Sequence, residues 1–303
     1  NFSRIKMNWG NLFTDDAKFY RNYLGISWYW STNINNSEFY YNWAVNFNLD
    51  NLGWWWIKSW YLNSRITNSN FHNNEIWYHA TGGIVSIENT AFTDHYFSKF
   101  WSTKNLIWKW VYLENWNLYT SNRTTFKSNE EAIYWTWTSI YLNETWFAYN
   151  RINTEKSLEN LWWTLWKAVI AFWSDINIWN NTVFYDNDLA LDLFPNETKS
   201  WSININNSTF WNNWILERWK LLFNWSYELE SDWITKKMYD VNTPTIIAWW
   251  IKKLFIDSSS IFWAKDDQNI FSWAEELKVN KSYIYDWKTS DKYTIYSHNI
   301  GNI

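Results

Sequence analysis

The chain has 303 residues, of which 26 are basic and 30 acidic, so its formal net charge is −4, and no run of Lys or Arg would form a phosphate-binding stripe. We therefore expect no nucleic-acid partner. The chain contains no Cys, which excludes disulfide bonds and thiolate metal sites, and no apolar stretch approaches the roughly 18 residues of a membrane-spanning helix.

No linker rich in Pro, Gly or Ser divides the chain, so we expect a single domain over residues 1–303. The first residue is Asn1, and no basic-then-apolar signal segment opens the chain. We therefore expect the sequence to be a fragment of a longer protein.

Short strands recur along the chain, each built on one phrase. The phrase is clearest at residues 203–213, where Ile203 and Ile205 alternate with Asn204 and Asn206 before an Asn-Ser step and Phe210. Such alternation predicts strands with Ile on one face and Asn on the other. In chain order, the aromatic or apolar anchor of the phrase recurs at Phe39, Phe71, Phe92, Phe126, Phe147, Phe184, Phe210, Phe262 and Ile284.

Each anchor has Ser or Thr two places before it, and five of the nine have Asn three places before it. The anchors lie 21 to 52 residues apart, which indicates a coil of 21 to 26 residues with insertions around Arg151–Leu165 and Glu230–Thr245. We expect a short helix at Glu155–Glu159, and one or two poorly matched coils between Phe210 and Phe262. Asn suits the corner of a coil, because it tolerates the left-handed conformation better than any residue but Gly.

Burial explains why such coils stack. One coil cannot cover its inward Ile and Phe side chains, whereas neighbouring coils bury them in columns and satisfy each other's backbone groups. We therefore predict an all-β solenoid, a parallel β-helix of about twelve coils, with Asn at equivalent corners stacked as an amide ladder.

The repeats at residues 66–74 (Ile-Thr-Asn-Ser-Asn-Phe-His-Asn-Asn) and 87–92 (Ile-Glu-Asn-Thr-Ala-Phe) resemble those of right-handed parallel β-helix proteins. This superfamily includes pectate lyases, polygalacturonases and many bacterial surface proteins. The resemblance covers about Ser31 to Asp286, where the repeats are clearest. It implies a right-handed winding and a secreted or cell-surface location, and it is specific for the fold but not for an activity.

Tryptophan usage is anomalous, because the chain has 32 Trp against 6 Gly, whereas ordinary usage of about 7% would give roughly 21 Gly. Trp follows Asn or Asp, where turns normally require Gly, at Trp9, Trp43, Trp116, Trp214, Trp225, Trp233 and Trp287. We interpret the Trp residues as UGA codons that specify Gly in the source organism. The alternative is a Trp-rich protein that binds sugars on stacked indoles.

The enzymes of this superfamily cleave acidic polysaccharides, and their motifs are mostly missing here. Pectate-lyase-like sites combine Ca²⁺-binding carboxylates with an Arg, often beside a Pro, but neither Pro195 nor Pro244 has an Arg within several residues. Polygalacturonase-like sites need His-Gly and Arg-Ile-Lys. No His precedes Gly, and the single Arg-Ile-Lys, residues 4–6, precedes every candidate acid.

Five acidic residues are the weak candidates for chemistry. Asp186, Asp188 and Asp192 supply oxygen ligands at short spacing, which makes Ca²⁺ the one cofactor to consider, although a solvated turn after the Phe184 anchor is the interpretation that we favour. Asp266 and Asp267 occupy a similar position, and paired carboxylates can divide acid and base roles in glycoside cleavage. The four His show no metal-ligand spacing, so we interpret them as surface or turn residues.

Two functions remain open. One is a non-catalytic secreted or cell-surface protein, adhesive or structural, whose candidate partners are a polysaccharide or another cell surface. The other is a polysaccharide lyase or glycoside hydrolase acting on an acidic polysaccharide. The missing catalytic motifs and the regular Asn-rich coils favour the first.

Overall fold

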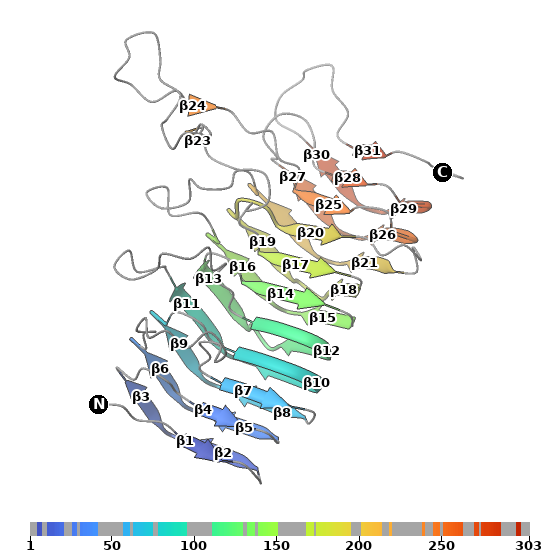
Figure 1. Ribbon diagram of the computed structural model, residues 1–303. Helices are drawn as coiled ribbons and strands as arrows, with labels where there is room; N and C mark the ends of the chain where they lie inside the picture. The colour runs from blue at the N-terminus through green and yellow to red at the C-terminus, as the bar shows by residue number, and fades with distance from the viewer. Residues whose placement is uncertain are drawn as a thin grey trace, which may run out of the picture.

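A computed structural model of the chain consists of short strands joined by turns and longer connections (Figure 1). In the residues that it describes, no helix occurs. These residues are 5–7, 11–20, 26–28, 31–41, 57–60, 63–74, 78–95, 111–129, 132–136, 139–150, 168–172, 174–194, 201–213, 218–219, 238–239, 245–248, 251–262, 270–272, 274–285 and 295–297.

Two sheets contain nearly all of the strands, and every pairing in them is parallel. The narrow sheet has ten described strands, paired in chain order: β3 (Lys18–Tyr20), β6 (Glu38–Tyr40), β9 (Asn70–His72), β11 (Ala91–His95), β13 (Thr125–Asn129), β16 (Trp146–Ala148), β19 (Val183–Tyr185), β22 (Thr209–Trp211), β27 (Ser260–Phe262) and β30 (Tyr283–Tyr285).

The wide sheet has 19 described strands in two ladders, joined by the long strands β10 (Tyr78–Glu88) and β12 (Val111–Ser121), which run through both. The first ladder adds β1 (Ile5–Met7), β4 (Ile26–Trp28), β7 (Ile57–Trp60), β14 (Ile133–Thr136), β17 (Val169–Phe172), β20 (Leu191–Phe194), β25 (Ile246–Ala248), β28 (Ile270–Ser272) and β31 (Ile295–Ser297). The second ladder adds β2 (Leu12–Asp15), β5 (Thr32–Asn35), β8 (Ser64–Thr67), β15 (Ser139–Asn143), β18 (Asp175–Trp179), β21 (Ser202–Asn206), β26 (Lys253–Asp257) and β29 (Glu276–Asn280).

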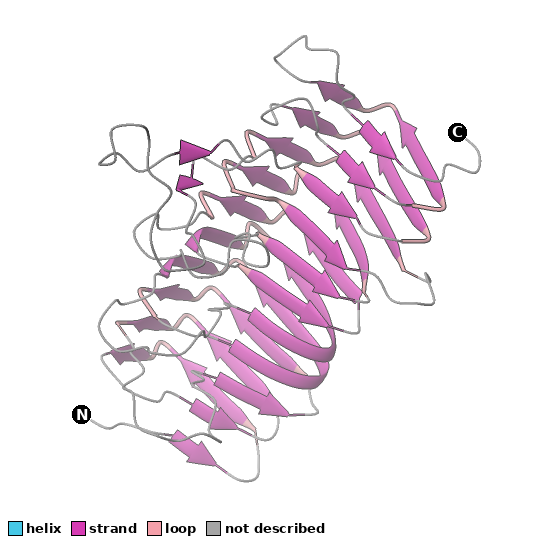
Figure 2. Ribbon diagram, turned by 45° about the horizontal axis from the view of Figure 1, so that its top comes forward, coloured by secondary structure: helices cyan, strands magenta, loops and turns pink. Residues whose placement is uncertain are grey.

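Each coil therefore passes through the first ladder, the second ladder and the narrow sheet in turn, and successive coils lie side by side (Figure 2). Outside these sheets, β23 (Arg218–Trp219) and β24 (Met238–Tyr239) form an antiparallel pair. The all-β class and the parallel stacking of repeats are confirmed, and the architecture is consistent with a β-solenoid. The sequence predicted two strands per coil, and the first ladder is a third.

The predicted internal columns are present. In the narrow sheet the anchor side chains are in register, buried from Phe39 to Phe210 and partly buried at Phe19, and their rings stack at centroid distances of 4.5 to 5.3 Å. In the second ladder, Ile34, Ile66 and Ile87 are register partners and are fully buried. One hydrophobic cluster contains both columns, so the coils share a single core.

Two details of the predicted repeat are wrong. The residue aligned with Phe210 is Ile261, which is fully buried, while Phe262 lies one position further along the strand and is only partly buried. Strand β22 pairs directly with β27, so no further coil separates Phe210 from Ile261, and the long interval is an insertion. A copy that the phrase did not detect is centred on Phe19, which is in register with Phe39.

The corner after the second ladder has the left-handed backbone that the Asn-rich phrase predicted. In all ten described copies of this corner one residue has a φ of 44° to 52°: Asp16, Asn36, Asn68, Asn89, Asn122, Glu144, Asn180, Asn207, Ser258 and Lys281. Asn is the commonest of them, as expected from its low cost at positive φ. Trp is not among these described corner residues.

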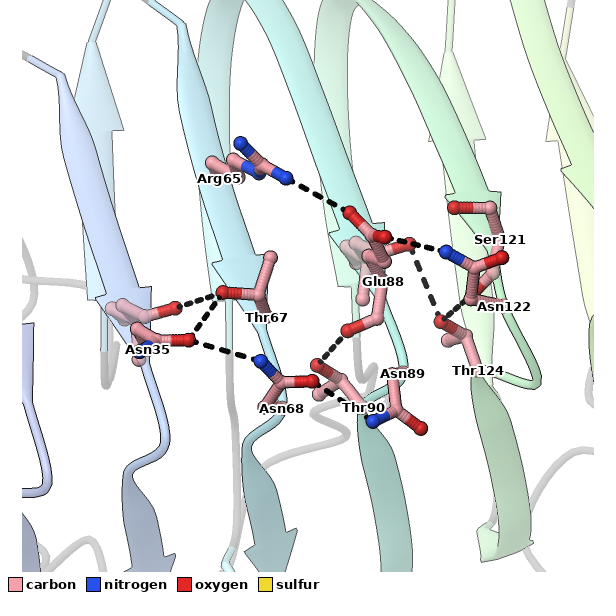
Figure 3. A network of polar contacts seen from close by, with 12 residues as sticks. Asn35, Arg65, Thr67, Asn68, Glu88, Asn89, Thr90, Ser121, Asn122 and Thr124 are labelled. Atoms are coloured by element: carbon pink, nitrogen blue, oxygen red, sulfur yellow. Dashed lines mark hydrogen bonds and ion pairs between the residues drawn. The ribbon is translucent and has the colours of Figure 1, made fainter.

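Side-chain amides form part of the predicted ladder at this corner (Figure 3). The Asn89 Nδ2 donates to the Asn68 Oδ1 at 2.9 Å, and the Asn68 Nδ2 donates to the Asn35 Oδ1 at 3.1 Å. These two hydrogen bonds link the side chains of three successive coils. Beside them, Arg65 and Glu88 form an ion pair at 3.0 Å. Asn122 and Asn180 instead donate to Glu88 and Asn143, which end strands of the preceding coils.

A second, buried ladder lies three places after the anchor in four successive coils. The backbone N–H groups of Asn129, Asn150 and Asn187 donate to the Oδ1 of the next Asn in the row, at 3.0, 3.1 and 3.1 Å, and the row ends at Asn213. The side-chain Nδ2 of Asn150 donates to the Phe126 carbonyl oxygen at 3.1 Å. These bonds satisfy polar groups that the turn would otherwise leave buried without partners.

The long connections all follow strands of the narrow sheet. They comprise residues 41–56, 96–110, 149–168 and 212–245, and the alternate connections are short. The predicted insertions at 151–165 and 230–245 fall within two of them, so their position in the coil is now defined. Most of these residues, and the predicted helix at 155–159, lie outside the described residues.

Candidate functional site

Exposed aromatic side chains gather on the outer face of the narrow sheet and on the corner that follows it, and the second ladder also has exposed aromatic residues, such as Phe13 and Tyr119. On each strand, the residue after the buried anchor points outward, because side chains alternate along a strand. In register, these positions form an outer row: Tyr20, Tyr40, His72, Thr93, Lys127, Ala148, Tyr185, Trp211 and Phe262.

Three rings stack at the start of this row. The Tyr20 and Tyr40 centroids are 4.7 Å apart, and the Tyr40 and His72 rings are 5.2 Å apart with an angle of 6° between their planes. The parallel register of the coils produces this stack, because each ring lies directly over its partner. Both faces of the Tyr40 ring are therefore covered.

Tyr41 lies at the next position, on the corner that follows the narrow sheet, with a φ of 52°. Its ring meets Tyr40 at a centroid distance of 5.9 Å and His72 at 6.1 Å, with interplanar angles of 69° and 74°. Since the faces of Tyr40 are covered, Tyr41 lies across the edges of these rings. The Tyr41 side chain is 40% exposed, so it presents an aromatic surface to solvent.

The same arrangement recurs further along the solenoid. Tyr149 occupies the same corner position with a φ of 55°, and its ring meets Tyr185 at 5.2 Å and 83°. The Lys127 Nζ is 5.8 Å from the centre of the Tyr149 ring, within the range of a cation–π contact. Tyr149 is 41% exposed, almost the same fraction as Tyr41.

A charged row runs beside the first aromatic group. The Lys18 Nζ is 3.1 Å from Glu38, and the His72 Nε2 is 3.3 Å from the other oxygen of the same carboxylate. The hydrogen bond and the charge of Lys18 hold the pKa of Glu38 below its ordinary value. The Asn73 Nδ2 lies 3.1 Å from the His72 Nδ1, which favours the tautomer whose Nε2–H donates to Glu38.

The acidic residues that the sequence grouped together lie on different elements, the corner after β19 and the strand β20. Asp186 lies on the corner after β19, and its Oδ1 accepts a hydrogen bond from Asn212 at 2.8 Å. Asp188 and Asp192 are only 2% exposed; Asp192 lies in β20, in register with Ile170 and Ile247. Asp266 and Asp267 lie outside the described residues. In the described part of the chain, no three His, Asp or Glu residues are grouped closely enough to hold a metal ion.

The repeat phrase does not include the aromatic positions. Tyr20, Tyr40, Tyr41 and Tyr185 each follow an anchor Phe by one or two places, but the phrase ends at the anchor and at the Asn beyond it. The contact of His72 with Glu38 depends on the register of β6 and β9, which the local sequence does not specify. The signal for this row is the recurrence of aromatic residues in the two positions after each anchor.

No helix in the described residues has the length and apolarity to cross a membrane. Comparison of the chain with protein-family models, with curated proteins and with solved structures gives no match.

Proposed function

We propose that this chain is a right-handed parallel β-helix of the pectate-lyase-like type, with about twelve coils, and that it is secreted or held at a cell surface. In this proposal it is a non-catalytic adhesive or structural protein that binds a glycan on the outer face of its narrow sheet. Tyr41 and Tyr149, which the fold holds partly exposed on one corner, are the observation that carries the proposal.

Aromatic side chains suit this role, because sugar rings have an apolar C–H face that packs on an aromatic ring and hydroxyl groups that bind nearby polar atoms. The carboxylate of Glu38, the Lys18 ammonium and the His72 imidazole lie beside the first aromatic group. The stacked Phe column lies beneath this row and packs against its strands, which favours a preorganised binding face.

The burial of Asp188 and Asp192 supports the non-catalytic alternative, because an acid that cleaves a polymer must reach the outer surface. Two assays on the purified chain test the proposal together. Binding to a panel of neutral and acidic polysaccharides is expected, and no release of reducing or unsaturated ends is expected at any Ca²⁺ concentration. Release of either product would favour the lyase or hydrolase alternative, and failure to bind any glycan would exclude the proposed role.

We also infer that the Trp residues stand for Gly. Of the seven Asn-Trp or Asp-Trp steps predicted as turns, Asn115-Trp116 is the one within the described residues, and this prediction is wrong, because the step lies inside strand β12. The register partner of Trp116 in β10 is nevertheless Gly83, which has a φ of 124°.

Trp201 adds a polar argument. Its indole Nε1 is buried and has no hydrogen-bond partner in the described residues, an arrangement that costs about 1–3 kcal/mol and that Gly would avoid. The proposed glycan site does not depend on the outcome, because its central residues are tyrosines. The test is the gene itself: UGA at most Trp positions is expected, and UGG at most of them would contradict the inference.

A further inference from the structure

We propose that Tyr41 and Tyr149 are two equivalent platforms that bind one linear neutral glycan, with its chain parallel to the solenoid axis. This inference rests on the proposed glycan-binding function and specifies its ligand. We call these two residues the tyrosine platforms.

The tyrosine platforms have the same local construction. Both residues lie two places after a buried anchor, and both have a left-handed backbone, with φ of 52° and 55°. Each ring packs edge-to-face on the outer-row ring of the next coil, His72 for Tyr41 and Tyr185 for Tyr149. The fold imposes positive φ at this corner, since the other described residues of the row share it, and a bulky aromatic residue is uncommon in this conformation. The chain nevertheless has a Tyr at two of these positions, with almost the same exposure.

The register of the narrow sheet fixes the spacing between the platforms. Strands β6 and β16, which precede the two tyrosines, are separated by four parallel pairings, through β9, β11 and β13. At about 4.8 Å per pairing, the platforms lie roughly 19 Å apart along the axis. A single sugar ring cannot reach both, whereas an extended oligosaccharide can.

The corner between the platforms is polar. The intervening residues of the same row are Asn73, Asp94 and Ser128, which also have positive φ and are all at least partly exposed. Short amide, carboxylate and hydroxyl side chains can bind sugar hydroxyls along the path. The exposed Asp94 carboxylate lies in the middle of the path and the exposed Lys127 ammonium lies at the Tyr149 ring, so the two charges offset each other and a neutral glycan is the better match.

The dependence of affinity on oligosaccharide length distinguishes binding at two platforms from binding at one. The probes are cello-, xylo- and chito-oligosaccharides from the disaccharide to the octasaccharide, with polygalacturonate as the acidic counterpart. A ligand that spans both platforms gains effective concentration, so at least one neutral octasaccharide should bind the intact chain about tenfold or more tightly than its disaccharide. Isothermal titration calorimetry measures this ratio.

The variants are Tyr41→Asn and Tyr149→Asn, because Asn already occupies this corner at Asn73 and Asn212 and tolerates its backbone. Each should abolish the length dependence, so that the octasaccharide binds like the disaccharide, and Tyr41→Phe should retain it. The matched control is Tyr119→Ala, in which a similarly exposed Tyr on the second ladder is removed and the length dependence persists.

Each result has a definite meaning. Binding without a length dependence, a length dependence that survives both Asn variants, or binding of polygalacturonate alone would overturn the two-platform inference and leave glycan binding in place. If none of the neutral or acidic glycans binds, the proposed function itself fails, and the two-platform inference fails with it.

Discussion

Replacing Phe184 with Ala measures how strongly the anchor column holds the coils together. The Phe184 side chain is 0% exposed, and its ring stacks on Phe147 and on Phe210 at 4.6 Å in each case. Truncating a buried Phe to Ala costs about 3–5 kcal/mol of unfolding free energy. Aromatic pairs add about 0.5–1.5 kcal/mol each beyond their burial, so two lost pairs place the expected cost near the upper end of that range.

Urea denaturation followed by far-ultraviolet circular dichroism gives the free energy of unfolding. In a solenoid, stability is approximately a sum of coil and interface terms, so the loss can also emerge as an early transition of the coils around Phe184. The matched control is Phe13→Ala on the second ladder, where the side chain is 65% exposed and the expected change is below about 0.5 kcal/mol. Equal losses in the two variants would refute the continuous column.

Three further predictions follow from the corners and the charged row. Asn150→Ala removes the acceptor of the buried Asn129 N–H, so a loss of about 1–3 kcal/mol in urea denaturation is expected, and an unchanged midpoint would contradict it. Asn36 has a φ of 45°, so Asn36→Val should lower the melting temperature by the equivalent of about 1–2 kcal/mol while Asn36→Gly is tolerated. The contact with Lys18 lowers the pKa of Glu38 in the folded state. The stability from that contact is therefore present above the ordinary pKa of 4.5 and is lost as the pH falls through the lower folded-state pKa. The melting temperature of Glu38→Gln should lack this dependence on acidic pH.

Much of the coil could be predicted from the sequence, because burial imposes a period of two on the residues of a strand. Ile203 and Ile205 face inward as predicted, and the Asn at the corner has the expected left-handed backbone. The first ladder could not be predicted in the same way. Many of its strands have three or four residues, too short for alternation to be distinguished from chance, and their pairing depends on the coils above and below.

The misplaced anchor at Phe262 has a physical explanation. The run Ser258-Ser259-Ser260 satisfies the Ser-before-anchor rule for either Ile261 or Phe262, so the local pattern leaves two alignments. Core packing decides between them, because a shift of one residue exchanges the inward and outward faces of a strand. The candidate site depended on register in the same way, since Tyr41 contacts His72 in the next coil.

The stacking of coils in register can be measured directly by cross-linking, and the absence of Cys makes the chain suitable for it. Asn177 and Asn204 are register partners on the outer face of the second ladder, with a side-chain hydrogen bond of 3.0 Å between them. Their expected Cα separation of about 4.8 Å permits a disulfide, whereas the diagonal pair Asn177 and Asn206 lies about 8 Å apart and does not. Mild oxidation of Asn177→Cys/Asn204→Cys should give an intramolecular disulfide, detected by mass spectrometry. No disulfide in this variant, or an equal yield in Asn177→Cys/Asn206→Cys, would contradict the stacked-coil architecture.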